Sequence, residues 1–471
     1  MISARDPSQL QGLEPLWLGL LIAALLFYPL LALQHRGSRR WLEPPVTLGV
    51  VFAYYTVFGP LKALQEGGWI DRSANLRHGF EIAWLGALVA FGSFLVGYAL
   101  IPQKLGVPRR ISGLDPARSW LYGQRVNQVA LGAFALVTGP KLLAMLNPIA
   151  VADSNLGSGL DLGAFENYAT LAVNLLVPGC LLMLAALMRG RGSPLTLAGW
   201  VFVAVAIYTS LGFRYRLVLL LAPMALLWLL TTRRRPNIPL MVALILLLIL
   251  GSGAFAYTRT YGGGLNLESL EGKSLIDIFL YGFQDSVIFV TSGGVMAATP
   301  DHHPFFGLEP FIQTLLFPIP KLLMPDKDSA GYLYQALEAI YPSRIYAAGA
   351  AYLNFAEYYM IAGWWSLIAI YGILGVAYRR LWLWLQPRQS EPLALVAYVV
   401  SVCYLFMVVS RGYLPQVAML FAFSAAPLFI IYRLTSRPAP ISANLARSIE
   451  KATPFMREKL RLRQRKPLHT R

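Results

Sequence analysis

The chain has 471 residues, of which 56% are hydrophobic and only 13% are charged, and its formal net charge is +17. A soluble protein of this length covers its exterior with charged side chains, so the composition excludes a soluble globular protein and indicates a polytopic membrane protein. Both cysteines, Cys180 and Cys403, fall inside apolar runs, which excludes a disulfide scaffold and a cysteine metal site.

Apolar runs are the main signal along the chain. A helix needs roughly 20 apolar residues to cross the hydrocarbon core of a bilayer, and a crossing segment must satisfy its own backbone hydrogen bonds, which predicts helices. We therefore expect an all-α fold in which each of these runs is a transmembrane helix. The eleven candidate spans lie at residues 15–33, 46–64, 80–101, 127–146, 167–188, 195–212, 217–231, 238–257, 350–378, 392–410 and 416–434.

The distribution of lysine and arginine predicts the orientation. When the connections are taken alternately, those on one side hold 27 of the 40 basic residues and only 5 of the 23 acidic ones. Basic loops stay in the cytoplasm, so we expect the N-terminus outside and the C-terminus inside. The net charge follows from this bias, and no nucleic-acid partner is predicted; the basic tail also suits anionic lipid headgroups.

Four regions follow from this topology: a membrane domain of eight spans at 1–257, a large outer loop at 258–349, a membrane domain of three spans at 350–434, and a basic cytoplasmic tail at 435–471. A loop of this length in a compact protein is usually functional. Its segment 275–298 is nearly apolar enough to span. Polar residues recur along that segment at helical spacing, which favours a helix that lies at the interface or lines a cleft.

Five arginines lie on the predicted outer side, where the charge bias disfavours them. Two of them interrupt the apolar sequence TSLGFRYRLVLLL at 209–221. Guanidinium groups match phosphate oxygens with two parallel hydrogen bonds, so a group of arginines at helix mouths favours a phosphate site. The alternative is that each arginine reaches the outer headgroups or pairs with an outer acid. The five are Arg214, Arg216, Arg259, Arg344 and Arg411.

Two outer acids are candidates for a general base. Glu357 lies inside the predicted span 350–378. An ionisable side chain in a bilayer costs roughly 2.5 to 3.5 kcal/mol, so its position indicates a partner or a task. Asp285, on the polar face of 275–298, is the alternative base. A structural reading stays open for Glu357, in which it only pairs with an outer arginine.

Several short motifs follow one another in the second half of the chain. They are GFRYR at 212–216, YTR at 257–259, FPIPKLLMPDKD at 317–328, AEYYMIAGWWSLIAIYGILG at 356–375 and SRGY at 410–413. Their order, over residues 195–434, resembles the oligosaccharide repeat-unit polymerases, the Wzy-type O-antigen and capsular polysaccharide polymerases of bacteria. The resemblance implies a GT-C-like glycosyltransferase architecture in the inner membrane, with a large periplasmic loop that contains interfacial helices.

The resemblance also implies an activity. The enzyme would take a growing glycan from undecaprenyl (polyprenyl) diphosphate and transfer it to the sugar of an incoming lipid-linked repeat unit, on the periplasmic face, to build lipopolysaccharide, capsule or exopolysaccharide. It would need no metal, nucleotide sugar or other cofactor. The implied partners are the undecaprenyl diphosphate-linked donor and acceptor glycans, together with a chain-length regulator and a flippase of the same pathway.

The resemblance places the arginines on the diphosphate, because negative charge grows on this leaving group and must be stabilised there. Arg214 and Arg259 are expected to hold it, with Arg216, Arg344 and Arg411 as further ligands at the same mouth.

The proton of the acceptor hydroxyl requires a general base within hydrogen-bond reach. Glu357 is expected to take it, with Asp285 as the second choice. Tyr358 is expected to stack on a sugar ring, or to belong to the aromatic belt of the interface.

Two other functions share parts of this pattern. An O-antigen ligase, which moves finished polymer to a lipid A core, uses the same donor. A flippase or other transporter of lipid-linked oligosaccharides commonly shows repeated halves and ionisable residues near the midplane. The sequence shows no internal repeat, and its charges gather at the outer edge, which favours chemistry on one face.

Overall fold

The computed structural model describes most of the chain. The described residues are 14–34, 40–60, 70–71, 74–75, 79–102, 110–147, 160, 165–212, 214–232, 238–260, 264–320, 322–324, 331–341 and 351–438.

Helices make up nearly all of the described structure, together with three ladders of two short strands. Short 3₁₀ or π turns are labelled η. In chain order the elements are α1 (Glu14–Gln34), η2 (Arg40–Leu42), α2 (Pro44–Ala53), η3 (Tyr54–Phe58), β1 (Ile70–Asp71), β2 (Ala74–Asn75), α4 (Phe80–Leu100), β3 (Arg110–Ser112), α5 (Pro116–Thr138), α6 (Lys141–Met145), α7 (Glu166–Leu171), η6 (Ala172–Leu175), α8 (Leu176–Leu187), α9 (Pro194–Ser210), α10 (Arg214–Thr232), α11 (Ile238–Thr258), β4 (Arg259–Thr260), β5 (Gly264–Leu265), η7 (Leu267–Leu270), α12 (Leu275–Tyr281), η8 (Gln284–Val287), α13 (Ile288–Ala298), α14 (Glu309–Leu316), α15 (Gly331–Glu338), α17 (Asn354–Ala362), α18 (Trp364–Leu385), η9 (Gln386–Arg388), α19 (Pro392–Cys403), α20 (Leu405–Ser410), α21 (Leu414–Thr435) and β6 (Ser436–Pro438).

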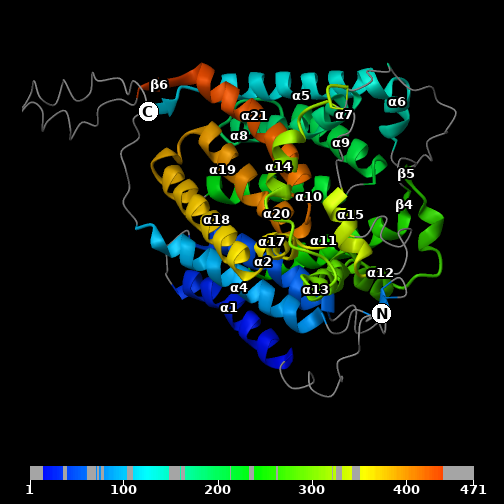
Figure 1. Cartoon of the computed structure of the whole chain (residues 1–471). Helices are drawn as coiled ribbons and strands as arrows, with labels where there is room; N and C mark the ends of the chain where they lie inside the picture. Colours follow the sequence, from blue (N-terminus) through cyan, green and yellow to red (C-terminus); the bar gives the residue numbers. More distant parts are fainter. Residues whose placement is uncertain are drawn as a thin grey trace, which may run out of the picture.

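The long helices form a bundle with two distinct ends (Figure 1). Antiparallel strands β3 and β6 mark one end, which we call the β3–β6 end, and β4 and β5 mark the other, which we call the β4–β5 end. Seven described segments are long and apolar enough to cross a membrane, and four shorter apolar helices accompany them. The chain is therefore a helical, membrane-embedded protein, and the number of eleven spans stays a prediction.

The helix at the fourth predicted span differs from the expectation of 127–146. Helix α5 begins eleven residues earlier, because the Asp115 side chain caps it by accepting the Arg118 backbone N–H at 2.7 Å, and Pro116 occupies its first position. It ends at Gly139, whose φ of 55° is left-handed. The predicted span was wrong at both ends, because the apolar run continues across this break into α6.

The expected span 350–378 is also divided. Gly363 has a φ of 69° and separates α17 from α18. With nine residues, α17 is too short to cross a hydrocarbon core, whereas residues 364–388 are long enough. Glu357 therefore belongs to a short helix, not to a spanning one.

The segment 275–298 breaks at Gly282 into α12, η8 and α13. Helix α12 packs closely along α11, and glycines make this approach possible. A Cβ at Gly253 would lie 1.7 Å from the Ile278 carbonyl oxygen, and a Cβ at Gly282 would lie 2.2 Å from the Ile249 carbonyl oxygen. Asp285 lies just after this break, in η8.

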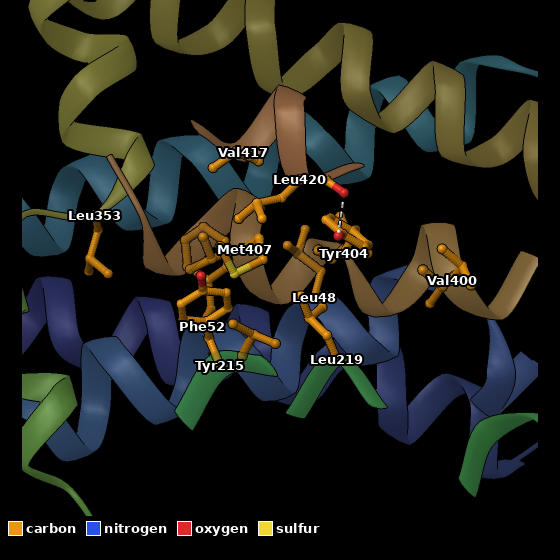
Figure 2. Close-up of a cluster of buried hydrophobic side chains, with 14 of the residues drawn as sticks. Leu48, Phe52, Tyr215, Leu219, Leu353, Val400, Tyr404, Met407, Val417 and Leu420 are labelled. Carbon is orange, nitrogen blue, oxygen red and sulfur yellow. Dashed lines mark hydrogen bonds between the residues drawn. The ribbon is translucent and has the colours of Figure 1, made fainter. Parts of the chain in front are cut away.

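One buried core surrounds the start of α10. Figure 2 shows Tyr215 and Leu219 of α10 packed among side chains of α2, α20 and α21. The Tyr404 hydroxyl, between α19 and α20, donates to the Leu420 carbonyl of α21 at 2.8 Å. The core thus fixes the first turn of α10, which carries two of the predicted arginines.

Helices α4 and α18 cross with their backbones in contact. A Cβ at Gly97 of α4 would lie 2.1 Å from the Gly372 carbonyl oxygen of α18, whereas a Cβ at Gly92 of the same helix meets nothing within 4 Å. Small residues allow membrane helices to approach this closely.

We expect Gly97→Ala to lower stability by roughly 1 to 3 kcal/mol, because the extra methyl forces the two helices apart. Gly92→Ala is the matched control and should be neutral or slightly stabilising, because alanine has the higher helix propensity. Thermal unfolding of the purified protein in detergent measures both, and equal midpoints for the two variants would contradict the contact.

Candidate functional site

The site is built around the first turn of α10, at the β4–β5 end. The Gly212 N–H donates to the Thr209 carbonyl at 2.9 Å, and its φ of 76° lets the chain turn out of α9. Arg214 and Arg216 then occupy the start of α10 and are 7% and 5% exposed. Cations at a helix N-terminus oppose the helix dipole, so this pair requires negative charge nearby.

Asp285 supplies part of that charge. Its carboxylate forms an ion pair with Nη2 of Arg214. Nη1 of Arg214 lies 3.4 Å from both the backbone oxygen and the hydroxyl of Ser252, on α11. The Asp285 side chain is 38% exposed. The ion pair is therefore buried on the arginine side and open on the aspartate side.

Arg411 joins the same site from the break between α20 and α21. The guanidinium carbons of Arg216 and Arg411 each lie 5.7 Å from the centre of the Tyr215 ring, so they are no more than twice that distance apart. Both contacts have cation–π geometry. Three of the five predicted arginines thus lie at this turn of the described structure.

Glu357 is fully buried at the start of α17 and accepts three hydrogen bonds. The Tyr332 hydroxyl of α15 donates to Oε1 at 2.6 Å, and so does the Leu414 N–H at 2.9 Å. Nδ2 of Asn354 donates to Oε2 at 3.2 Å. Oδ1 of Asn354 in turn accepts the Arg411 N–H at 3.1 Å. The carboxylate therefore positions the backbone of Arg411 and is itself closed off.

Burial raises the pKa of Glu357 to about 7, and the hydrogen bonds from Leu414 and Tyr332 oppose that rise. The folded state then holds a proton at this carboxyl more strongly than the unfolded chain does. Its contribution to stability is present below the ordinary glutamate value and is lost as the pH rises through about 7.

The other predicted site residues do not join this group in the described structure. Tyr358 is buried, with its ring in a T-shaped contact with Tyr371 at 5.7 Å, and offers no face to a sugar. The backbone of Arg259 pairs with Leu265 in the β4–β5 ladder, and its side chain is not described. Arg344 lies outside the described residues.

Several participants were missed from the sequence. Asn354 precedes Glu357 by three residues, which places both side chains on one face of a helix. Tyr215 lies between the two arginines of α10. The spacings of Asn354 and Tyr215 could have been recognised in the sequence. Ser252 and Tyr332 could not, because they come from distant segments that contain no motif. Among the described residues, no group of three or more His, Cys, Asp or Glu side chains is arranged to hold a metal ion.

Comparison with known proteins gives no match to any protein-family model, curated protein or solved structure.

Replacing Glu357 by glutamine should lower stability by roughly 1 to 3 kcal/mol at low pH, because the new amide donor faces the amide donor of Asn354. Asn354 cannot turn over to accept it without losing the bond from Arg411. The variant should also lack the decline in stability that we expect of the native protein between about pH 5 and about pH 7.

Unfolding midpoints measured across this pH range check both parts. Tyr332→Phe is the matched variant, because it keeps the ring and the charge while removing one donor. It should retain the pH-dependent decline. An identical pH profile for the native protein and Glu357→Gln would show that Glu357 does not titrate as described.

Proposed function

We propose that the chain is a metal-independent glycosyltransferase that polymerises undecaprenyl diphosphate-linked repeat units on the periplasmic face of the inner membrane. The observation that carries this proposal is the contact of Arg216 and Arg411 with the Tyr215 ring, next to the Arg214–Asp285 ion pair, at one end of an apolar bundle. These residues come from two of the motifs that resemble the polymerase family, GFRYR and SRGY. A lipid-linked diphosphate fits both the apolar surroundings and the charge.

The reaction breaks the bond between the anomeric carbon of the donor sugar and a diphosphate oxygen. The electron pair stays on that oxygen, and the guanidinium groups stabilise the charge where it develops. Arginine suits this role because it stays protonated and its planar fork matches phosphate oxygens. Arg214, Arg216 and Arg411 are the proposed ligands, and Arg259 and Arg344 remain proposed from the sequence alone.

The acceptor hydroxyl forms the new bond to the anomeric carbon and gives up its proton to a base. We assign this role to Asp285, because its carboxylate is 38% exposed next to Arg214, whereas Glu357 is completely buried. Glu357 becomes a positioning residue that acts through Asn354 and the Leu414 N–H on the segment of Arg411. This reverses the order of the two acids expected from the sequence.

The proposal requires the β4–β5 end to face the periplasm, as the charge bias predicts. We expect Leu267→Cys, in η7 at this end, to react with a membrane-impermeant maleimide in intact spheroplasts. Leu195→Cys, at the opposite end of α9, should react only after permeabilisation. Both positions are exposed, and the native Cys180 and Cys403 are buried, so background labelling should be low. The reverse pattern would place the arginines in the cytoplasm and refute the proposed site.

The polymerase, ligase and flippase functions differ in what accumulates without the protein. In a strain that lacks it, a polymerase predicts surface lipid capped by a single repeat unit. A ligase predicts long polymer that stays on its carrier, and a flippase predicts no outward-facing repeat unit. Gel profiles of the surface glycan and of the extracted carrier lipid separate the three outcomes.

Arg214→Ala and Asp285→Asn should each reduce polymerisation by roughly 100-fold or more, because one removes a phosphate ligand and the other the base. Arg214→Lys should restore little, since a single ammonium cannot bond Asp285 and Ser252 as the fork does. The matched control is Arg118→Ala, which breaks an exposed ion pair with Asp115 elsewhere in the chain. Membrane levels are compared by immunoblot. Full polymerisation by Arg214→Ala at a normal level would remove Arg214 from the site.

A further inference from the structure

A cavity of about 210 Å³ lies between α18, α19 and α21, near the β3–β6 end. It is almost entirely apolar, and Figure 1 shows α19 between the other two helices. Phe429 is 57% exposed, so the cavity borders the surface that faces lipid. Its lining includes Trp384 of α18, Ala397 and Val400 of α19, and Leu428, Phe429 and Tyr432 of α21.

Glu391 introduces a carboxylate into this apolar lining. It precedes α19 and is 8% exposed. Its Oε2 accepts the Ser112 N–H at 2.7 Å, whereas its Oε1 is buried without a hydrogen-bond partner in the described part of the chain. Burial raises the pKa of this carboxyl above its ordinary value. A buried carboxylate oxygen is stabilised by a donor, and the cavity is the space from which a donor could reach it.

Two arginines contact aromatic side chains that line this cavity, although neither arginine is itself part of the lining. The Arg388 guanidinium carbon lies 5.1 Å from the centre of the Trp384 ring, and that of Arg433 lies 4.9 Å from the centre of the Phe429 ring. Arg388 also donates to the Trp384 carbonyl at 2.9 Å. Two cations therefore contact the rings of a cavity whose lining also contains a buried acid, and the charge of Arg388 opposes the rise in the pKa of Glu391.

A ligand that matches these groups must have three parts. It needs an apolar chain for the cavity, an anionic group for the arginines, and a cationic hydrogen-bond donor for Glu391. A phosphate suits the guanidinium groups, and a primary ammonium suits the carboxylate. Phosphatidylethanolamine has all three parts. Phosphatidylcholine has no N–H donor, and phosphatidylglycerol has no cation.

We propose that this cavity and its rim bind one phosphatidylethanolamine molecule. An acyl chain lies in the cavity, the phosphate lies at Arg388 and Arg433, and the ammonium group donates to Oε1 of Glu391. The lipid bridges α18 and α21 across α19. This site is at the opposite end of the bundle from the arginines of α10 and does not depend on the proposed enzymatic function.

The test uses full-length, delipidated protein titrated with phosphatidylethanolamine, phosphatidylglycerol or phosphatidylcholine of identical acyl chains, with bound lipid counted by native mass spectrometry. We expect one phosphatidylethanolamine to be retained in preference to the other two. Glu391→Gln should weaken its binding by roughly tenfold or more, since a charge-assisted hydrogen bond is lost. The glutamine oxygen still accepts the Ser112 N–H, so the fold should persist.

Ala397→Trp should weaken the binding of all three lipids, because the indole fills the cavity. Arg118→Gln, an exposed arginine outside the lining, is the control and should bind as the native protein does. Gel filtration and thermal unfolding establish that each variant is folded.

Equal retention of the three lipids, or undiminished binding by folded Glu391→Gln, would overturn the proposal. So would a carbodiimide cross-link between Glu391 and a lysine of the chain's own 439–471 segment in lipid-containing membranes, because that segment would then occupy the cavity.

Discussion

The proposed site depends on the three hydrogen bonds that the Glu357 carboxylate accepts. Polar groups in an apolar interior are stable only when they are hydrogen-bonded, and its three donors come from α15, α17 and the start of α21. Satisfying one acid therefore fixes the mutual position of three segments. Arg411 is held in place through Asn354, which bonds to both the acid and the Arg411 backbone.

The start of α10 differs from the Glu357 site, because its charged groups are placed unfavourably. Two arginines are placed where the helix dipole disfavours them, and burial withdraws them from water. Asp285 and the face of the Tyr215 ring compensate part of this cost. In the proposed function, the diphosphate adds negative charge at this turn.

Most helices could be predicted from apolar runs alone, because helix length in a bilayer is set by the hydrocarbon thickness. Residues 80–101 and 238–257 match α4 and α11 to within one residue at each end. The predicted helix boundaries were wrong where a helix ends or begins without a change in hydropathy. Gly139 and Gly363 end helices inside continuous apolar runs, and α10 begins at Arg214, three residues before its apolar run, because its charged first turn is stabilised by tertiary contacts.

The sequence by itself determined the membrane class and the position of most helices, because these depend on local hydropathy. It also predicted that the arginines lie on the outer side, because that prediction depends only on the distribution of charge along the chain. It could not determine which charges meet. Arg214 and Asp285 are 71 residues apart, and Arg411 joins them from a third segment. Only the tertiary structure decided that Asp285 is partly exposed while Glu357 is fully buried, because accessibility is set by the packing of segments distant in sequence.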